Sequence, residues 1–174
     1  MKSRVAFLDY DGVVNTPIWN EKGTTCTYNF PSHNKVNNFQ AVQWISECCQ
    51  KFHYDIVVTS TWRMNANYKE CLINGGLRPG IEILGCTEDL WRTDRNTCRG
   101  DEIAKYLADH PEINYYMIID DDADMLPEQM DHFIKTDALI GFTLKEFEQF
   151  EKIFMADKGR GGSFPESKYK DYRD

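Results

Sequence analysis

The stretch from Val5 to Gly12 constrains the fold of this chain more than any other, because an apolar run ends there abruptly in two carboxylates. A continuous apolar run is typical of a parallel strand that is covered on both faces. Gly12, directly after Asp9 and Asp11, permits the sharp turn that such a strand needs at its carboxyl end, where open α/β sheets bind ligands. Repulsion between two acids on the same side of a strand has to be relieved by a cation or by a proton. A solvated Asp-x-Asp-Gly turn has the same residues, so this motif alone does not establish chemistry.

The composition limits the number of domains and the class of partner. A chain of 174 residues fits one domain, expected at 1–156, with a flap-like loop at 15–34 and a polar, mobile tail at 157–174. The net charge of −8 disfavours broad non-specific binding to nucleic acid. The six cysteines and four histidines lack the spacing of a zinc site or a disulfide framework, which favours free thiols. Without an apolar run of membrane length or a signal peptide, the sequence indicates a cytoplasmic protein with no membrane partner.

Apolar periodicity predicts that strands and helices alternate along the chain. Strands are expected at 54–60, 81–86, 115–119 and 138–142, and helices at 35–51, 65–74, 100–110 and from 143 onward. Thr143 and Glu146 form a capping box at the start of the last helix. This alternation is typical of α/β proteins and predicts a three-layer, Rossmann-like fold, with a parallel sheet of about five strands and helices on both faces.

Reactive side chains follow three of the predicted strands. Because the carboxyl ends of parallel strands lie side by side, these side chains are expected to share one crevice. They are Asp9 and Asp11 after the first strand, Thr59 and Ser60 after the second, and Asp120 and Asp121 after the fourth. An apolar strand that feeds three consecutive acids is costly without a cation nearby, so we expect a metal at this crevice.

These residues and their order resemble the haloacid dehalogenase (HAD) superfamily of aspartate-nucleophile phosphatases. The family pattern has an Asp-x-Asp-Gly strand end, a hydroxyl residue after the second strand, a basic residue that opens a later helix, and an acidic pair after the fourth strand. The matching residues are Asp9-Tyr10-Asp11-Gly12, Ser60-Thr61-Trp62, Arg99 and Asp120-Asp121. Each motif is weak alone, and the ordered set is specific.

The resemblance implies a HAD-like fold and a magnesium-dependent phosphomonoester hydrolase. Asp9 would attack phosphorus to form an aspartyl-phosphate. Asp11 would act as general acid toward the leaving oxygen and then as general base on water. Mg²⁺, which prefers oxygen ligands, would be held by Asp9, Asp120, Asp121 and the backbone carbonyl of Asp11.

The resemblance also implies the substrate contacts, and two of them stay open. Ser60 would bind a phosphoryl oxygen, or Thr59 if the register slips by one residue. Arg99 would bind another, although the family more often has Lys there and three other basic residues compete: Arg92, Arg95 and Lys105. The expected substrate-binding set also includes Gly12, Thr61 and Arg63. Trp62 is expected to pack beneath the turn after the second strand.

The candidate substrates follow from the cap and from a likeness to a subgroup. Family members insert a cap at two positions, and here neither offers more than the loop at 15–34, so an open site with a minimal cap is expected. Two stretches, Ser60-Thr61-Trp62-Arg63 and Arg99-Gly100-x-Glu102-Ile103, resemble a subgroup that includes nucleic-acid-repair-associated phosphatases, which suggests a nucleotide or a polynucleotide 3'-phosphate end. The alternatives are a small-metabolite phosphatase, a phosphotransferase and, in another class, a catalytically silent binding or regulatory protein. Retention of both Asp9 and Asp11 argues against the silent protein.

Overall fold

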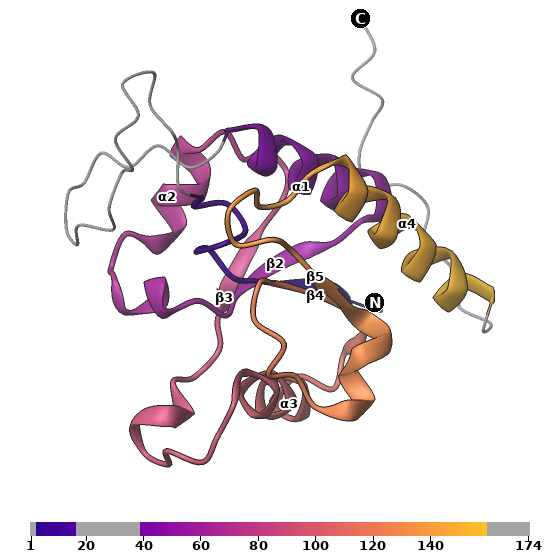
Figure 1. Ribbon diagram of the computed structural model, residues 1–174. Helices are drawn as coiled ribbons and strands as arrows, with labels where there is room; N and C mark the ends of the chain where they lie inside the picture. The colour runs from indigo at the N-terminus through magenta and orange to yellow at the C-terminus, as the bar shows by residue number, and fades with distance from the viewer. Residues whose placement is uncertain (1–2, 17–38, 160–174) are drawn as a thin grey trace, which may run out of the picture.

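The computed structural model describes residues 3–16 and 39–159, which form a parallel sheet between two layers of helices (Figure 1). Its strands are β1 (Ser3–Leu8), β2 (Asp55–Val58), β3 (Ile83–Cys86), β4 (Ile113–Asp120) and β5 (Phe133–Lys135). They lie in the order β3-β2-β1-β4-β5, and every neighbouring pair is parallel. The predicted α/β, Rossmann-like class is confirmed, and the apolar run that ends in the two acids is the central strand.

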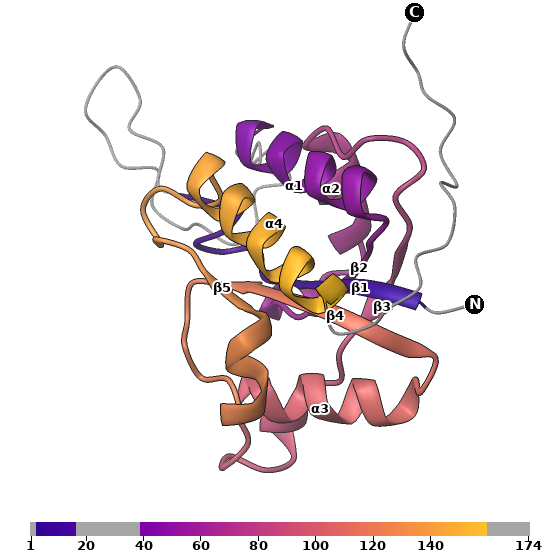
Figure 2. The ribbon, with the colours of Figure 1, turned by 90° about the vertical axis from the view of Figure 1, so that its right-hand side faces the viewer.

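The two faces of the sheet bury different side chains of β1. Ala6 and Leu8 face a core shared with α1 (Phe39–Phe52), α2 (Tyr68–Asn74) and α4 (Leu144–Gly159). Val5 and Phe7 face a second core, to which α3 (Arg99–Asp109) contributes Ile103. Figure 2 shows the sheet nearly edge-on between these layers. The strand is therefore apolar throughout because both of its faces are covered.

Aromatic packing joins the helices that begin and end the described domain. Phe52 of α1 stacks on Phe150 of α4 with 5.7 Å between ring centroids, and Trp44 packs against Phe147 at 5.5 Å. One half of the predicted capping box is present at the start of α4, since Glu146 accepts a hydrogen bond from the Thr143 backbone N–H at 2.9 Å. Thr143 Oγ1 accepts from the Lys145 N–H at 3.3 Å, one residue earlier than the pattern requires. None of the helices in the described ranges is both long and apolar enough to cross a membrane.

The predicted strand at 138–142 is wrong, and β5 lies earlier in the chain. Residues 138–140 form a turn in which Gly141 donates to the Asp137 carbonyl at 2.7 Å and has a φ of +79°. The apolar residues that suggested a strand are divided between two environments: Leu139 is 70% exposed, whereas Phe142 is buried and donates to the Val13 carbonyl. Tertiary packing, not a strand, explains the apolar character of Phe142.

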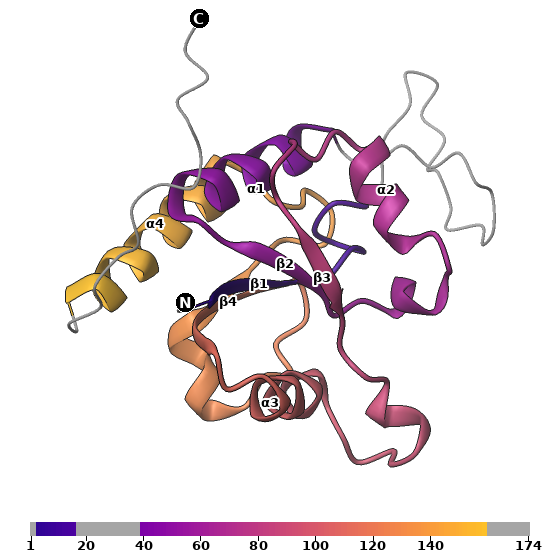
Figure 3. The same ribbon diagram turned by 180° about the vertical axis from the view of Figure 1, so that it is seen from behind.

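Three 3₁₀ helices shape the ends of the strands: η1 (Thr61–Met64), η2 (Leu90–Arg92) and η3 (Pro127–His132). The helix predicted at 65–74 corresponds to α2, which begins at Tyr68, and η1 precedes it. Between β2 and α3, the described chain forms η1, α2, β3 and η2, without a separate cap domain (Figure 3). Of the predicted flap at 15–34 only residues 15 and 16 are described; α4 continues to Gly159, and the remainder of the predicted tail lies outside the described residues.

Candidate active site at the carboxyl edge of the sheet

Backbone hydrogen bonds bring three strand ends together. The Asp9 N–H donates to the Ile119 carbonyl at 3.0 Å, and the Thr59 N–H donates to the Leu8 carbonyl at 2.9 Å. The first residue after β1 therefore lies beside the end of β4, and the first residue after β2 lies beside the end of β1. The structure gathers at one edge the side chains that the sequence placed at three separate strand ends.

Asp9, Asp120 and Asp121 form the acid cluster, in which one carboxylate oxygen of each residue lies within 4.8 Å of the others. Asp9 is 7% exposed and Asp120 is 2% exposed. Burial raises the pKa of Asp9 to about 6, against the opposing effects of Arg99 and of a hydrogen bond with Ser60. Burial, followed by the charge of Asp9, raises the pKa of Asp120 to about 8. The cluster holds more negative charge than its protein partners neutralise.

The donor set of the acid cluster fits a divalent cation. Asp120 Oδ1 accepts a hydrogen bond from the Asp122 N–H at 2.9 Å, but Asp120 Oδ2 is buried without a hydrogen-bond partner among the described residues. Its neighbour Arg99 Nε lies 3.5 Å away, too far for a good hydrogen bond. A buried carboxylate oxygen in this state is expensive, and a cation that prefers oxygen ligands would satisfy it.

Gly12 lets the acid cluster close. It has a φ of +72°, and a Cβ built on it would lie 2.3 Å from the Asp121 carboxyl carbon. Thr136 Oγ1 donates to the Gly12 carbonyl at 2.8 Å, which fixes this turn against the loop after β5. Any side chain at this position would displace Asp121, so the glycine is required by close packing. Its predicted contact with substrate stays a prediction.

Asp11 lies beside the acid cluster, and both of its carboxylate oxygens accept hydrogen bonds from side chains outside the cluster. Trp62 Nε1 donates to Asp11 Oδ2 at 3.0 Å, and Asn15 Nδ2 donates to Oδ1 at 3.2 Å. The Tyr10 ring lies 5.8 Å from the Trp62 ring, and the Tyr10 hydroxyl donates to the Tyr68 carbonyl at 2.6 Å. Trp62 thus does more than pack beneath the turn. An indole N–H next to a reactive strand end is the signal that sequence reasoning overlooked. The metal ligand predicted from Asp11 is its backbone carbonyl, which stays a prediction.

Ser60, not Thr59, is the hydroxyl that meets the acid cluster. Ser60 hydrogen-bonds to Asp9, an interaction that lowers the pKa of Asp9, and its Oγ caps η1 by accepting from the Trp62 N–H at 3.3 Å. Thr59 Oγ1 is buried without a partner among the described residues. Thr61 lines a pocket next to the cluster.

Arg99 is the basic residue that the fold places at the acids. Its Nη2 lies 3.8 Å from Asp9 Oδ1, and its Nη1 lies 3.5 Å from Glu102 Oε2. The competing cations have other partners. Arg92 pairs with Asp89 at 2.9 Å, Lys105 pairs with Asp109 and Glu88, and Arg95 lies over the Trp91 ring.

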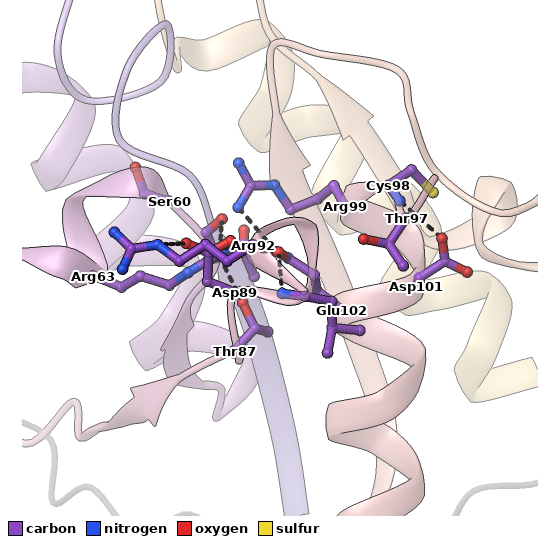
Figure 4. A network of polar contacts seen from close by, with 12 residues as sticks. Ser60, Arg63, Thr87, Asp89, Arg92, Thr97, Cys98, Arg99, Asp101 and Glu102 are labelled. Carbon is purple, nitrogen blue, oxygen red and sulfur yellow. Dashed lines mark hydrogen bonds and ion pairs between the residues drawn. The ribbon is translucent and has the colours of Figure 1, made fainter. Parts of the chain in front are cut away.

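Arg63 is engaged in an internal network, although it also borders the pocket. Its guanidinium donates to Glu102 Oε1 at 2.7 Å, to Thr87 Oγ1 at 3.0 Å and to the Thr59 carbonyl at 3.1 Å (Figure 4). We call Arg63, Glu102 and Thr87 the Arg63 network. It ties the ends of β2 and β3 to α3, and Glu102 links it to Arg99 at 3.5 Å. The role of Arg63 in substrate binding stays a prediction.

Comparison with known proteins adds one finding to this geometry. The family model of the HAD domain in Swiss Army Knife RNA repair proteins matches residues 5–147, a range that includes every predicted site residue. Comparisons with curated proteins and with solved structures found no match to the chain.

Proposed function

Since the chain belongs to the family of HAD domains in Swiss Army Knife RNA repair proteins, and with it to the phosphatase-type hydrolases, we propose that it is a magnesium-dependent phosphomonoesterase. Its proposed substrate is a nucleotide or a polynucleotide 3'-phosphate end. The observation that carries the proposal is the acid cluster, with its orphaned Asp120 oxygen, beside the Arg99 guanidinium. This arrangement offers a nucleophile, a cation site and a phosphate clamp within one edge of the sheet.

The proposed reaction consists of two displacements on phosphorus. In the first, a carboxylate oxygen of Asp9 forms a bond to phosphorus, the bond to the leaving oxygen breaks, and Asp11 gives that oxygen a proton. In the second, water attacks the aspartyl-phosphate, Asp11 takes the proton of the water, and phosphate leaves. Trp62 and Asn15 support these roles by holding the Asp11 carboxylate apart from the acid cluster.

Asp9 has to be ionised to attack. Burial opposes ionisation by raising its pKa, whereas Arg99 and Ser60 favour it. A Mg²⁺ ion held by the acid cluster and the Asp11 carbonyl would neutralise charge on both the phosphate and the carboxylates. Arg99 and Ser60 would hold the phosphoryl oxygens, and a guanidinium suits that task because its donors match phosphate geometry.

The family description and the local charge both support a nucleic-acid-derived substrate. The net charge of the chain is −8, yet Arg92, Arg95 and Arg99 follow one another between η2 and the start of α3. Arg92 is paired with Asp89 at 2.9 Å and Arg95 lies over the Trp91 ring, so Arg99, 3.8 Å from Asp9, is the cation of this segment that would meet a phosphate. One phosphorylated end can therefore be held locally even though the whole chain is acidic.

The test is release of inorganic phosphate, with Mg²⁺ or with EDTA, from an aryl phosphate, mononucleotides, and 3'- and 5'-phosphorylated oligonucleotides. Asp9→Asn keeps the shape of the side chain and removes the nucleophile, so turnover should fall by at least about a thousandfold. Asp131→Asn, the same chemical change at an exposed position of η3, is the matched control and should keep full activity. Mg²⁺-dependent turnover that survives in Asp9→Asn would contradict the proposal.

A further inference from the structure

A pocket of about 320 Å³ lies next to the acid cluster, between η1, η2 and the beginning of α3. Arg99 belongs both to its lining and to the contacts of Asp9 and Asp120, so the pocket and the acid cluster adjoin at this side chain. A group esterified to a phosphate at Arg99 would lie at its entrance. The volume is at the lower end of the roughly 300–1,000 Å³ that small-molecule sites span, which suits a single small group.

The charges that line the pocket cancel. Arg63, Arg92 and Arg99 face three acids, Asp89, Glu102 and Asp124. Their ion pairs include Arg63 with Glu102 at 2.7 Å and Arg92 with Asp89 at 2.9 Å. No cation in the lining is left in surplus for a second phosphate. The pocket therefore favours an uncharged group attached to the phosphate over a further anionic group.

The apolar part of the lining contains an aromatic platform. Trp91 is 52% exposed and Met64 is 55% exposed, although both are large apolar side chains. The guanidinium of Arg95 lies 3.4 Å from the centroid of the Trp91 ring, a cation–π contact that holds the indole in place. Nucleobases stack on aromatic side chains, and arginine adds cation–π contributions at such sites. Thr61 and Thr97 add hydroxyls to the same lining.

We propose that this pocket binds the nucleoside that carries the scissile phosphate, with its base against Trp91 and its phosphate at Arg99. A nucleoside is uncharged, contains one flat aromatic ring system and carries hydrogen-bonding hydroxyls, so it matches the charge balance, the platform and the polar groups of the lining. This inference rests on the proposed phosphatase function and identifies the part of the substrate that is recognised beyond its phosphate. Trp91 is then a specificity-determining residue that takes no part in the chemistry.

The turnover test compares adenosine 3'-monophosphate with glycerol 2-phosphate, which is also the phosphate of a secondary alcohol but has no base. Trp91→Ala should raise KM for the nucleotide by about tenfold, because stacking of one base is lost, and leave KM for glycerol phosphate unchanged. Trp91→Phe, which keeps an aromatic face, should retain most of the preference. Met155→Ala on α4, which also removes an exposed apolar side chain, is the control and should change neither value.

A binding measurement separates this inference from the proposed function. Equilibrium binding of adenosine 3'-monophosphate to the Asp9→Asn protein, with and without Trp91→Ala, does not depend on turnover. About tenfold weaker binding of the nucleotide after Trp91→Ala, with binding of glycerol phosphate unchanged, supports the nucleoside pocket even if the wild-type protein releases no phosphate. Equal effects of Trp91→Ala on both ligands, or no effect on either, would overturn the pocket while leaving the phosphatase proposal intact.

Discussion

Two buried groups of charged side chains meet at the carboxyl edge of the sheet, and they differ in how completely their charges are paired. In the Arg63 network, the guanidinium has partners at 2.7, 3.0 and 3.1 Å, and the side chains of Arg63 and Glu102 are 7% and 6% exposed. In the acid cluster, one guanidinium lies 3.8 Å from Asp9 and 3.5 Å from Asp120, and the third carboxylate, Asp121, lies beside them.

The contrast teaches that burial of charge is not by itself a sign of function. The charges of the Arg63 network are matched, although Arg63 Nε is also buried without a hydrogen-bond partner among the described residues. The network joins elements that are distant in the sequence, as a structural brace does. The acid cluster retains unmatched negative charge and a buried oxygen without a hydrogen-bond donor among the described residues. Unpaired charge of this kind is typical of functional sites, where a bound ligand supplies the missing partner.

The largest loss of stability is expected when Arg63 is removed from the Arg63 network. Arg63→Met leaves Glu102 buried without its closest partner and should lower the free energy of unfolding by about 3–5 kcal/mol. The control is Arg92→Met, whose ion pair with Asp89 involves an arginine side chain that is 65% exposed. It should cost at most about 1 kcal/mol. Urea denaturation of both variants measures the difference, and similar losses in the two would contradict the distinction between brace and surface pair.

The acid cluster should destabilise the metal-free protein as the pH rises. Since the folded-state pKa values of Asp9 and Asp120 are raised to about 6 and about 8, the folded state keeps protons that the unfolded state has already lost. The contribution to stability is therefore complete below the ordinary carboxyl range and is lost as the pH rises through these values. In EDTA, the melting temperature should fall between pH 5 and pH 8.5.

Asp120→Asn and added Mg²⁺ sharpen this pH test. The amide carries no charge, so the variant should flatten the decline in melting temperature, whereas the exposed control Asp131→Asn should follow the wild type. Mg²⁺ binds the ionised cluster and should raise the wild-type melting temperature most at high pH. A wild-type melting temperature that rises toward pH 8.5 in EDTA would contradict the surplus of negative charge.

A smaller effect is expected from the contact between Trp62 and Asp11. Trp62→Phe removes the indole N–H donor at 3.0 Å from Asp11 Oδ2 and keeps an aromatic ring. For an alkyl phosphate, whose leaving oxygen needs a proton, kcat should fall by about tenfold, the worth of one such hydrogen bond. For an aryl phosphate with a good leaving group it should barely change. The control is Trp44→Phe, in the contact of α1 with α4, and it should alter neither rate. Equal losses of kcat for both substrates in Trp62→Phe would assign Trp62 a purely structural role.

The sequence predicted the parts of the molecule that depend on local pattern. The run before Asp9 and the run before Asp120 are continuous and apolar, and parallel pairing then brings their ends together without further information. The strand β5 was missed because Phe133–Lys135 is short, while Leu139 and Ile140 nearby have the stronger apolar signal. The turn closed by Asp137 and Gly141 exposes both of them.

The sequence did not reveal which polar side chains face one another across the fold. Arg63 lies 39 residues before Glu102, so no local pattern indicates that the two pair inside the protein. Trp62 is separated from Asp11 by 51 residues for the same reason. Motif order identified the residues at the strand ends, and only the folded chain shows which of them are held by neighbours and which are left for a ligand.

The most direct test of the central claim is to trap the phosphoryl group on Asp9. The protein is mixed with a 3'-phosphorylated oligonucleotide and Mg²⁺, quenched in acid within milliseconds, and mapped by peptide mass spectrometry. The proposed chemistry predicts a peptide carrying one phosphoryl group at Asp9, absent when EDTA replaces Mg²⁺ and absent in Asp9→Asn. Phosphate release without any phosphoryl group on Asp9, or with the group on another residue, would contradict it.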